Sequence, residues 1–326
     1  MAYNYPRIQA GGAERPQLLD FNHIYKVLAT SILETISPTR CVVCDEPGDV
    51  LCARCAASLP FIDLALACSR CGAPYGHALC TECPMPGSEA ALQHPEEAFP
   101  FTRARAALSF EEGAKKVIRT YKDGDELRLD AVIASIICSA IRMRQMDRSL
   151  VSLSTDTSNF WDKWTGHLSQ SFSEAEQSQG IASPPLRDWS QWAGALMYVP
   201  ASPEALLRRG FDHMERVARI VAQRTGLPLV RALESGKGAQ DQRNLGRSER
   251  LANRSESFSL ADSMRPGARR TADTDNQTVM SADVVPRRII LIDDVFTTGA
   301  TLSAATRVLL GGGAHEVRVV TCCRVW

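Results

Sequence analysis

The pattern of apolar and polar positions along the chain predicts a fold built from strands and helices. Residues 289–292 form a short β-branched apolar run, which is typical of a strand buried on both faces of a parallel sheet. The apolar positions of residues 302–310 recur with a helical period until a run of three glycines ends the pattern. Further helices are predicted at residues 112–121 and after Gly210, the latter ending at Gly226. A strand, a loop and a helix in this order are typical of an α/β protein.

Two polar stretches interrupt the patterned regions. Residues 145–194 are rich in Ser, Gln, Asp and Trp and show no sustained period, so we predict a flexible insertion between a helix that ends near Arg144 and a strand near Leu196. Residues 262–284 are predicted to form a second, solvated loop. Four tryptophans of the first insertion can dock a partner or cover an apolar surface, and we favour the second interpretation: Trp161, Trp164, Trp189 and Trp192.

The composition indicates a globular protein with more than one folded unit. The chain has 326 residues, of which 44% are hydrophobic and 23% charged. The apolar stretch at residues 131–141 is too short to span a bilayer, and the first residues lack the basic and apolar regions of a secretory signal, so we predict a cytoplasmic, reducing location. Since 37 basic residues balance 37 acidic ones, a nucleic-acid-binding surface would have to come from a local patch.

Eight of the eleven cysteines form four Cys-x-x-Cys pairs between residues 41 and 83. Two thiolates on one tight turn can bind the same ion, and two pairs complete a tetrahedral four-thiolate site. A redox motif would occur once within a βαβ unit, so zinc is favoured over iron–sulfur or redox chemistry, and over disulfides in a reducing compartment. The predicted ligands are Cys41, Cys44, Cys52, Cys55, Cys68, Cys71, Cys80 and Cys83.

The eight cysteines predict two structural zinc ions, because sites made only of thiolates keep no open coordination position. Pairing consecutive motifs closes the shortest loops and is therefore favoured, while interleaved pairing stays open. His77 lies between the last two pairs and is an alternative ligand, although a loop histidine beside a complete set of cysteines is more often simply exposed.

Two aspartates and a threonine-rich turn follow the strand predicted at residues 289–292. Asp293 and Asp294 lie at its carboxyl end, and residues 297–301 form a turn of small residues before the helix. Backbone N–H groups, threonine hydroxyls and a helix N-terminus together favour a phosphate. Ionised carboxylates suit sugar hydroxyls, because a carboxylate accepts hydrogen bonds and a ribose diol donates two. The alternative is an acidic strand end followed by an ordinary threonine N-cap.

This run of residues resembles the phosphoribosyl pyrophosphate (PRPP) motif of the type I phosphoribosyltransferases. The resemblance implies that Asp293 and Asp294 bind the ribose 2′- and 3′-hydroxyls. It also implies Mg²⁺ bound with PRPP, and displacement of pyrophosphate from the ribose C1 with Lys122, Arg208 or Arg209 neutralising the leaving group. Lys122 can equally be an ordinary helix-ending lysine. The 5′-phosphate would be cradled by Thr297, Thr298, Gly299, Ala300 and Thr301.

A basic segment lies between these motifs. Residues 203–270 hold 14 Lys or Arg against 8 Asp or Glu, a local excess of six positive charges. Such side chains can contact a pyrophosphate, a nucleic-acid backbone or only solvent, and charge alone favours solvent. Beyond Arg208, Arg209 and Lys237, the candidate anion or nucleic-acid contacts are Arg243, Arg247, Arg250 and Arg254.

Together with the cysteine module, these segments resemble the ComF family of competence-associated proteins, also described as the amidophosphoribosyltransferase-like ComF/GntX family. Two departures stand out. The family usually has Pro-Val-Pro where this chain has Tyr-Val-Pro-Ala at residues 198–201, and this loop corresponds to the place where pyrophosphate would be contacted. The family also has Asn-Gln where this chain has Asp212 and His213. The resemblance runs through residues 110–134, Pro200, the RRGF at 208–211, Gln242, Leu245, Glu249, Arg250, Asn253, Phe258 and the PRPP motif.

The resemblance implies an N-terminal tail and helix at residues 1–37, a double zinc ribbon at 38–90 and a phosphoribosyltransferase-like domain at 100–326. This domain would be an α/β fold with a doubly wound, mostly parallel sheet. Three functions are considered. The first is a phosphoribosyltransferase, linked to DNA uptake in competence or to nucleotide metabolism. The second is a non-catalytic PRPP- or nucleotide-binding adaptor that binds single-stranded DNA or a helicase partner. The third is a structural zinc scaffold with a vestigial loop.

Overall fold

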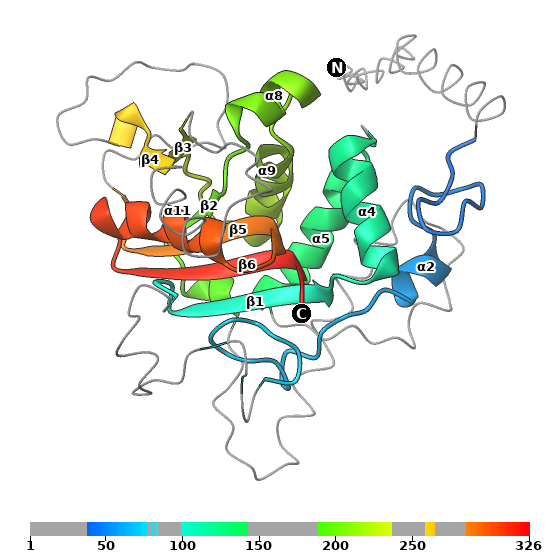
Figure 1. Cartoon of the computed structure of the whole chain (residues 1–326), viewed down its shortest axis with the longest axis horizontal. Helices are drawn as coiled ribbons and strands as arrows, with labels where there is room; N and C mark the ends of the chain where they lie inside the picture. Colours follow the sequence, from blue (N-terminus) through cyan, green and yellow to red (C-terminus); the bar gives the residue numbers. More distant parts are fainter. Residues whose placement is uncertain are drawn as a thin grey trace, which may run out of the picture.

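The computed structural model describes residues 38–76, 80, 83, 99–124, 126–142, 188–236, 258–264 and 285–326. Within these residues the chain forms an α/β fold with a four-stranded parallel sheet (Figure 1), and two clusters of four cysteines precede this sheet in the sequence. The predicted fold class is thereby confirmed. The tail and helix expected at residues 1–37 lie outside the described residues, and the domain boundaries stay a prediction.

The main sheet has the strand order β1-β6-β5-β2, and every neighbouring pair is parallel. Its strands are β1 (Arg103–Ser109), β2 (Ala195–Tyr198), β5 (Arg288–Phe296) and β6 (Glu316–Arg324). In the register of the two central strands, Phe296 lies opposite Arg324, so β5 and β6 end at the same level. Because the strands are parallel, their carboxyl ends meet at one edge of the sheet, where ligands bind in α/β folds.

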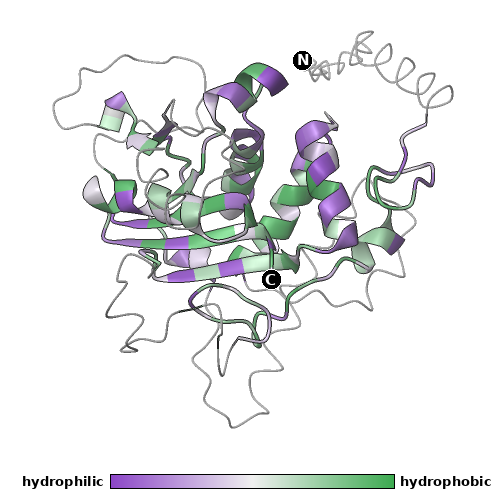
Figure 2. Cartoon of the chain, viewed as in Figure 1, coloured by the Kyte–Doolittle hydropathy of each residue, from purple (hydrophilic) through white to green (hydrophobic). Residues whose placement is uncertain are grey.

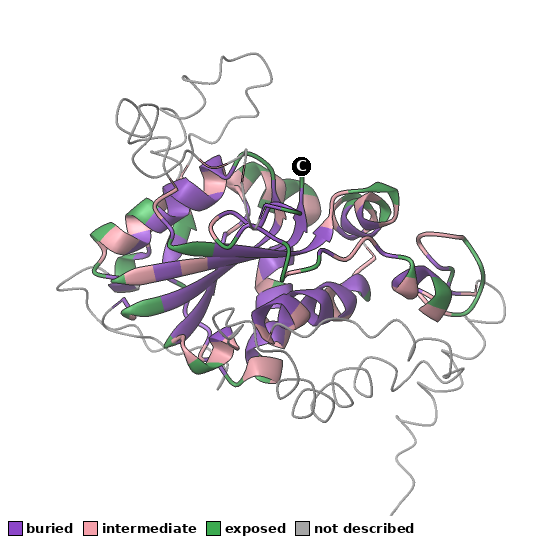
Figure 3. Ribbon diagram, turned by 90° about the horizontal axis from the view of Figure 1, so that it is seen from below, coloured by how far each residue is buried: buried purple, intermediate pink, exposed green. Residues whose placement is uncertain are grey.

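Helices cover both faces of this sheet. On one face lie α4 (Glu112–Asp123), α5 (Leu129–Arg142) and α9 (His213–Thr225), and on the other lies α11 (Ala300–Gly311). Ile290 and Ile292 of β5 face the first group, whereas Ile289 and Leu291 face α11. Burial on both faces explains the unbroken apolar run of this strand. Figure 2 shows hydrophobic and hydrophilic segments alternating along the strands, and Figure 3 shows the middle of the sheet as buried.

Smaller elements complete the described fold. They are α2 (Ala53–Ala57), η4 (Trp189–Gln191), α8 (Pro203–Arg209) and η5 (Asp262–Met264), and a separate antiparallel pair of β3 (Leu233–Ser235) and β4 (Phe258–Leu260). The segment between the cysteine clusters joins the edge of the main sheet, where Phe61 forms an antiparallel bridge with Leu108 of β1. None of the residues of α8 is buried.

Strand β5 is longer than its sequence pattern predicts. Asp293 and Asp294 belong to the strand, because its pairing with β6 continues to Phe296, and Asp293 lies opposite Thr321. The predicted helix at residues 302–310 in turn begins two residues earlier, at Ala300. The threonine-rich turn is therefore short and is held tightly between a strand and a helix.

The first insertion ends in a packed segment. Trp189 is buried, with the guanidinium of Arg105 3.8 Å from its ring centroid, and Arg318 lies 3.7 Å from the ring of Trp192. Both tryptophans pack against the core on the α5 side of the sheet. For these two residues the interpretation that tryptophans cover an apolar surface is confirmed. Trp161 and Trp164 lie outside the described residues, as do residues 145–187 and 265–284 of the two insertions.

Candidate functional site

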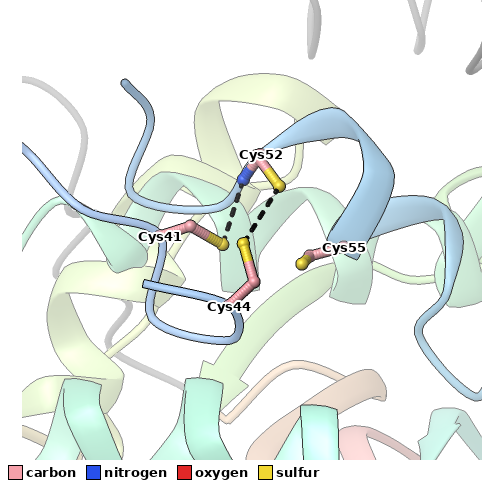
Figure 4. Close-up of side chains that lie close together, drawn as sticks. All are labelled: Cys41, Cys44, Cys52 and Cys55. Carbon is pink, nitrogen blue, oxygen red and sulfur yellow. Dashed lines mark hydrogen bonds between the residues drawn. The ribbon is translucent and has the colours of Figure 1, made fainter. Parts of the chain in front are cut away.

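The first cysteine cluster joins a turn to the start of α2. Cys41 and Cys44 come from the turn, and Cys52 and Cys55 from the helix start. Their four sulfurs lie within 4.8 Å of one another, and the Sγ atoms of Cys44 and Cys52 are 3.8 Å apart (Figure 4). In a tetrahedral zinc site with Zn–S bonds of about 2.3 Å, neighbouring sulfurs are about 3.8 Å apart. The four thiols can therefore hold one metal ion.

Backbone groups also favour thiolates in this cluster. The N–H of Cys52 donates to the Sγ of Cys41 over 3.4 Å. A backbone hydrogen bond from Glu46 is the main reason why the pKa of Cys44 is lowered to about 7. Burial acts in the opposite direction and raises the pKa values of Cys52 and Cys55. The conclusion that this cluster can hold a metal ion therefore rests on the sulfur distances.

The second cluster consists of Cys68, Cys71, Cys80 and Cys83. Its sulfurs also lie within 4.8 Å of one another, with 3.8 Å between Cys68 and Cys83 and 3.6 Å between Cys71 and Cys80. The prediction that consecutive Cys-x-x-Cys pairs share a site is confirmed for both clusters. His77, the alternative ligand, lies outside the described residues.

The two clusters contact different parts of the fold. The first packs on the α4–α5 side, where Lys116 donates to the backbone oxygen of Val43 over 3.2 Å. The second lies in the same core as Phe101, Phe296 and Leu302, close to the threonine-rich turn. Arg70, inside its first Cys-x-x-Cys pair, donates to the backbone oxygen of Phe99 over 3.2 Å.

Asp293 and Asp294 lie at the carboxyl edge of the sheet, and both are buried. The Oδ2 atom of Asp294 is 2.8 Å from the Nε2 atom of His213 and is ion-paired with the ammonium group of Lys122. The backbone N–H of Asp294 donates to the Oδ1 atom of Asp293 over 2.9 Å. The fold thus brings the end of α4, the start of α9 and the end of β5 together at one carboxylate.

The surroundings push the pKa values of the two aspartates apart. Burial and the neighbouring Asp294 raise the pKa of Asp293 well above its ordinary value. Burial acts on Asp294 in the same direction, but Lys122 and His213 outweigh it and hold the pKa of Asp294 below its usual range. The pair therefore holds one firmly ionised carboxylate beside a lysine and one carboxyl group that accepts a proton more readily.

Arg209 determines the tautomer of His213. Its Nη1 atom is 3.3 Å from the Nδ1 atom of the imidazole. A guanidinium group only donates hydrogen bonds, so Nδ1 accepts and Nε2 carries the proton that is donated to Asp294. Arg209 also approaches Asp123, with 3.7 Å between Nη2 and Oδ1. Sequence reasoning noted His213 only as a departure from a family pattern and missed its contact with Asp294.

The threonine-rich turn connects β5 to α11. Gly299 has a φ of 79°, and a Cβ atom on it would lie 2.6 Å from Cε1 of Phe99 and 2.7 Å from Cε2 of Phe296. Only glycine fits this position without strain. Thr297 and Thr298 are exposed. The turn therefore brings hydroxyl groups next to the N-terminus of a twelve-residue helix, an arrangement that is chemically suited to an anion.

The remaining predicted site residues lie as follows. Arg208 is exposed on α8, whereas Arg209 of the same helix contacts His213. Lys237, Gln242, Leu245, Glu249 and Asn253 lie outside the described residues, as do the four candidate anion contacts Arg243, Arg247, Arg250 and Arg254.

Comparison with known proteins gives one partial match. The competence protein ComFC of Streptococcus pneumoniae is 28% identical to this chain over 127 residues, which cover 39% of the chain and 46% of ComFC. The match thus spans less than half of that relative. No family model matches the chain. Within the described residues, the helices are all too short or too polar to cross a membrane.

Proposed function

We propose that this chain, which is homologous to ComFC over part of its length, is a ComF-like protein that binds the ribose and 5′-phosphate of PRPP at the carboxyl edge of its sheet. One observation carries the proposal. The buried pair Asp293 and Asp294 and the exposed Thr297 and Thr298 follow one another along a single strand end and turn. Carboxyl groups that could accept hydrogen bonds from a sugar and a turn that could bind an anion therefore follow one another, which supports binding of one sugar phosphate.

In this proposal the two carboxyl groups bind the sugar hydroxyls. Lys122 and His213 both contact Oδ2 of Asp294, so the Oδ1 atom of Asp294 would accept a hydrogen bond from a ribose hydroxyl. The raised pKa of Asp293 allows this group to donate as well as accept a hydrogen bond. The 5′-phosphate would bind the backbone N–H groups and hydroxyls of residues 297–301.

Transfer would break the bond between C1 and the pyrophosphate oxygen and form a bond from C1 to a nitrogen of the acceptor, which loses a proton. Mg²⁺ bound with PRPP would neutralise charge on the pyrophosphate. Lys122, which is ion-paired with Asp294, and Arg209, which contacts His213, would stabilise the same charge. We propose zinc for the two cysteine clusters, where it would be structural because four thiolates complete its coordination.

A second candidate, binding of PRPP or a nucleotide without transfer, is favoured by the loop at residues 198–201. Tyr198 is buried, and its hydroxyl accepts a hydrogen bond from Nε of Arg231 over 3.1 Å. A buried aromatic residue thus begins the loop where related enzymes would contact pyrophosphate. In this candidate the protein is an adaptor in DNA uptake, and single-stranded DNA or a helicase is its partner.

Calorimetry with PRPP and Mg²⁺ tests binding. The double variant D293N/D294N should weaken binding at least tenfold, whereas E234Q, which changes an exposed carboxylate on β3, should not. Unchanged affinity in the double variant would remove both ligand-binding candidates. Release of pyrophosphate from PRPP in the presence of nitrogen acceptors then distinguishes transfer from binding alone.

A further inference from the structure

Arg324, the last residue of β6, lies buried against the threonine-rich turn and is only 1% exposed. Its Nη1 atom donates to the backbone oxygens of Phe296 over 3.2 Å and of Thr297 over 2.6 Å, and to that of Val325 over 2.6 Å. Two of these three acceptors are successive peptide carbonyls, that of Phe296 at the end of β5 and that of Thr297 at the start of the turn. One side chain from the neighbouring strand therefore holds the start of the turn.

These contacts determine where the N–H groups of the turn point. In a planar trans peptide the C=O and the N–H point in opposite directions. The carbonyl of Phe296 shares a peptide unit with the N–H of Thr297, and the carbonyl of Thr297 shares one with the N–H of Thr298. Since both carbonyls point at Arg324, both N–H groups point away from it. The exposed side chains of Thr297 and Thr298 leave the turn on its solvent side.

The guanidinium is itself held in place. Its central carbon lies 4.1 Å from the centroid of the Phe296 ring. That ring packs edge-on against Phe99 and Phe101, with centroids 5.6 and 5.9 Å away. The backbone N–H of Val325 also donates to the oxygen of Phe296 over 2.9 Å. The guanidinium is therefore held by the ring of Phe296 as well as by the backbone carbonyls, and a cation stacked on an aromatic ring in a buried position keeps its orientation.

We propose that Arg324 is a positioning residue for anion binding, which orients the N–H groups of Thr297 and Thr298 toward a phosphate. This inference rests on the proposed function for its ligand, but the orientation of the turn is a property of the chain alone. Arg324 acts through the turn and does not touch the ligand. Its role therefore differs from that of Asp293 and Asp294, which would contact the sugar directly.

The binding test compares R324M, which removes the donors, with R324K, whose single nitrogen has three donors for the same carbonyls. The control is R103M, at an exposed arginine that begins β1 at the amino edge of the sheet. With ribose 5-phosphate and with inorganic phosphate as probes, R324M should weaken binding by roughly ten- to a hundredfold and R324K by less than tenfold. R103M should leave both affinities unchanged. In contrast, D293N/D294N should weaken only the binding of the sugar phosphate.

Hydrogen exchange of the unliganded protein provides an independent test. In R324M, peptides that cover residues 296–303 should exchange faster, while peptides from β1 and α5 keep their protection. Faster exchange throughout the fold would overturn the inference, because Arg324 would then be a general stabilising residue. Unchanged exchange and affinity in R324M would also overturn it. If the wild-type protein binds neither probe, the proposed function fails, and the exchange comparison alone decides whether Arg324 orients the turn.

Discussion

Lys122, near the end of α4, forms an ion pair with Asp294 of β5, and this contact joins a helix on one face of the sheet to its carboxyl edge. The ammonium group is one reason why the pKa of Asp294 stays low despite burial, and the two aspartates in turn raise the pKa of Lys122 against the effect of burial. The ion pair therefore keeps a negative charge at the position where the proposed ligand has its hydroxyls.

Substitution K122M should reduce the free energy of unfolding by about 3 kcal/mol at neutral pH, because it leaves a buried carboxylate without its cation. Since the pKa of Asp294 is lower in the folded than in the unfolded state, the ion pair stabilises the fold above the unfolded pKa of about 4. This stabilisation is lost as the pH falls through the folded pKa. Urea unfolding of both proteins at several pH values measures the difference, which should shrink in acid. A constant difference would contradict the assignment.

The hydrogen bond from His213 to Asp294 should depend on a donor, and not on an imidazole as such. H213Q keeps an N–H donor near the carboxylate, so we expect its affinity for PRPP to stay within about threefold of the wild type. H213A removes the donor and should weaken binding by roughly tenfold. Calorimetry measures both. H315A, which removes an exposed histidine beside Arg287, serves as the control. Equal affinities for H213A and H213Q would show that the hydrogen bond has no role in binding.

The two cysteine clusters should bind metal independently and affect different parts of the protein. We expect elemental analysis to find about two zinc ions per chain in the wild type and about one in C41S or C71S, since each variant breaks one four-thiolate site. Only C71S should weaken phosphate binding, because Arg70 and Phe99 connect the second cluster to Gly299. Equal loss of phosphate binding in C41S would contradict this connection.

Gly299 and Gly226 offer a matched comparison of backbone strain with and without a steric clash. Both have positive φ values, 79° and 73°, but a Cβ atom on Gly226 meets nothing within 4 Å. G226A should cost about 1 kcal/mol of stability from its backbone conformation alone. G299A should cost more, because Phe99 and Phe296 must move, and it should also weaken phosphate binding. Thermal unfolding and calorimetry measure the two effects. Equal stabilities of the two variants would contradict this, because they would show that the rings of Phe99 and Phe296 can move without lowering the free energy of unfolding.

Features whose parts lie close together in the sequence were predicted well. The spacing within and between the Cys-x-x-Cys pairs predicted both clusters, since the chain entropy of loop closure favours consecutive pairing. The threonine-rich turn was also predicted, but its predicted range of residues 297–301 was too long, because α11 already begins at Ala300. The boundaries of β5 were less accurate, because the pairing of Asp293 with β6 extends the strand beyond its apolar residues.

The contacts that complete the site could not be read from local patterns. The sequence left open whether Lys122 only ends a helix or also contacts other groups. In the structure it lies in the last turn of α4 and forms an ion pair with Asp294, while its role in the reaction stays a prediction. His213 and Arg324 gave no local signal, because one looks like an ordinary residue at a helix start and the other like an arginine at the end of a strand.

The sequence alone therefore determined the two cysteine clusters and the order of carboxylates and threonines along one strand and turn. Only the tertiary structure decided which side chains meet them. The physical reason is that parallel strands bring their carboxyl ends to one edge whatever their distance in the sequence. His213 and Arg324 reach the same strand end because α9 packs against β5 and β6 pairs with it, and Lys122 reaches it from the last turn of α4.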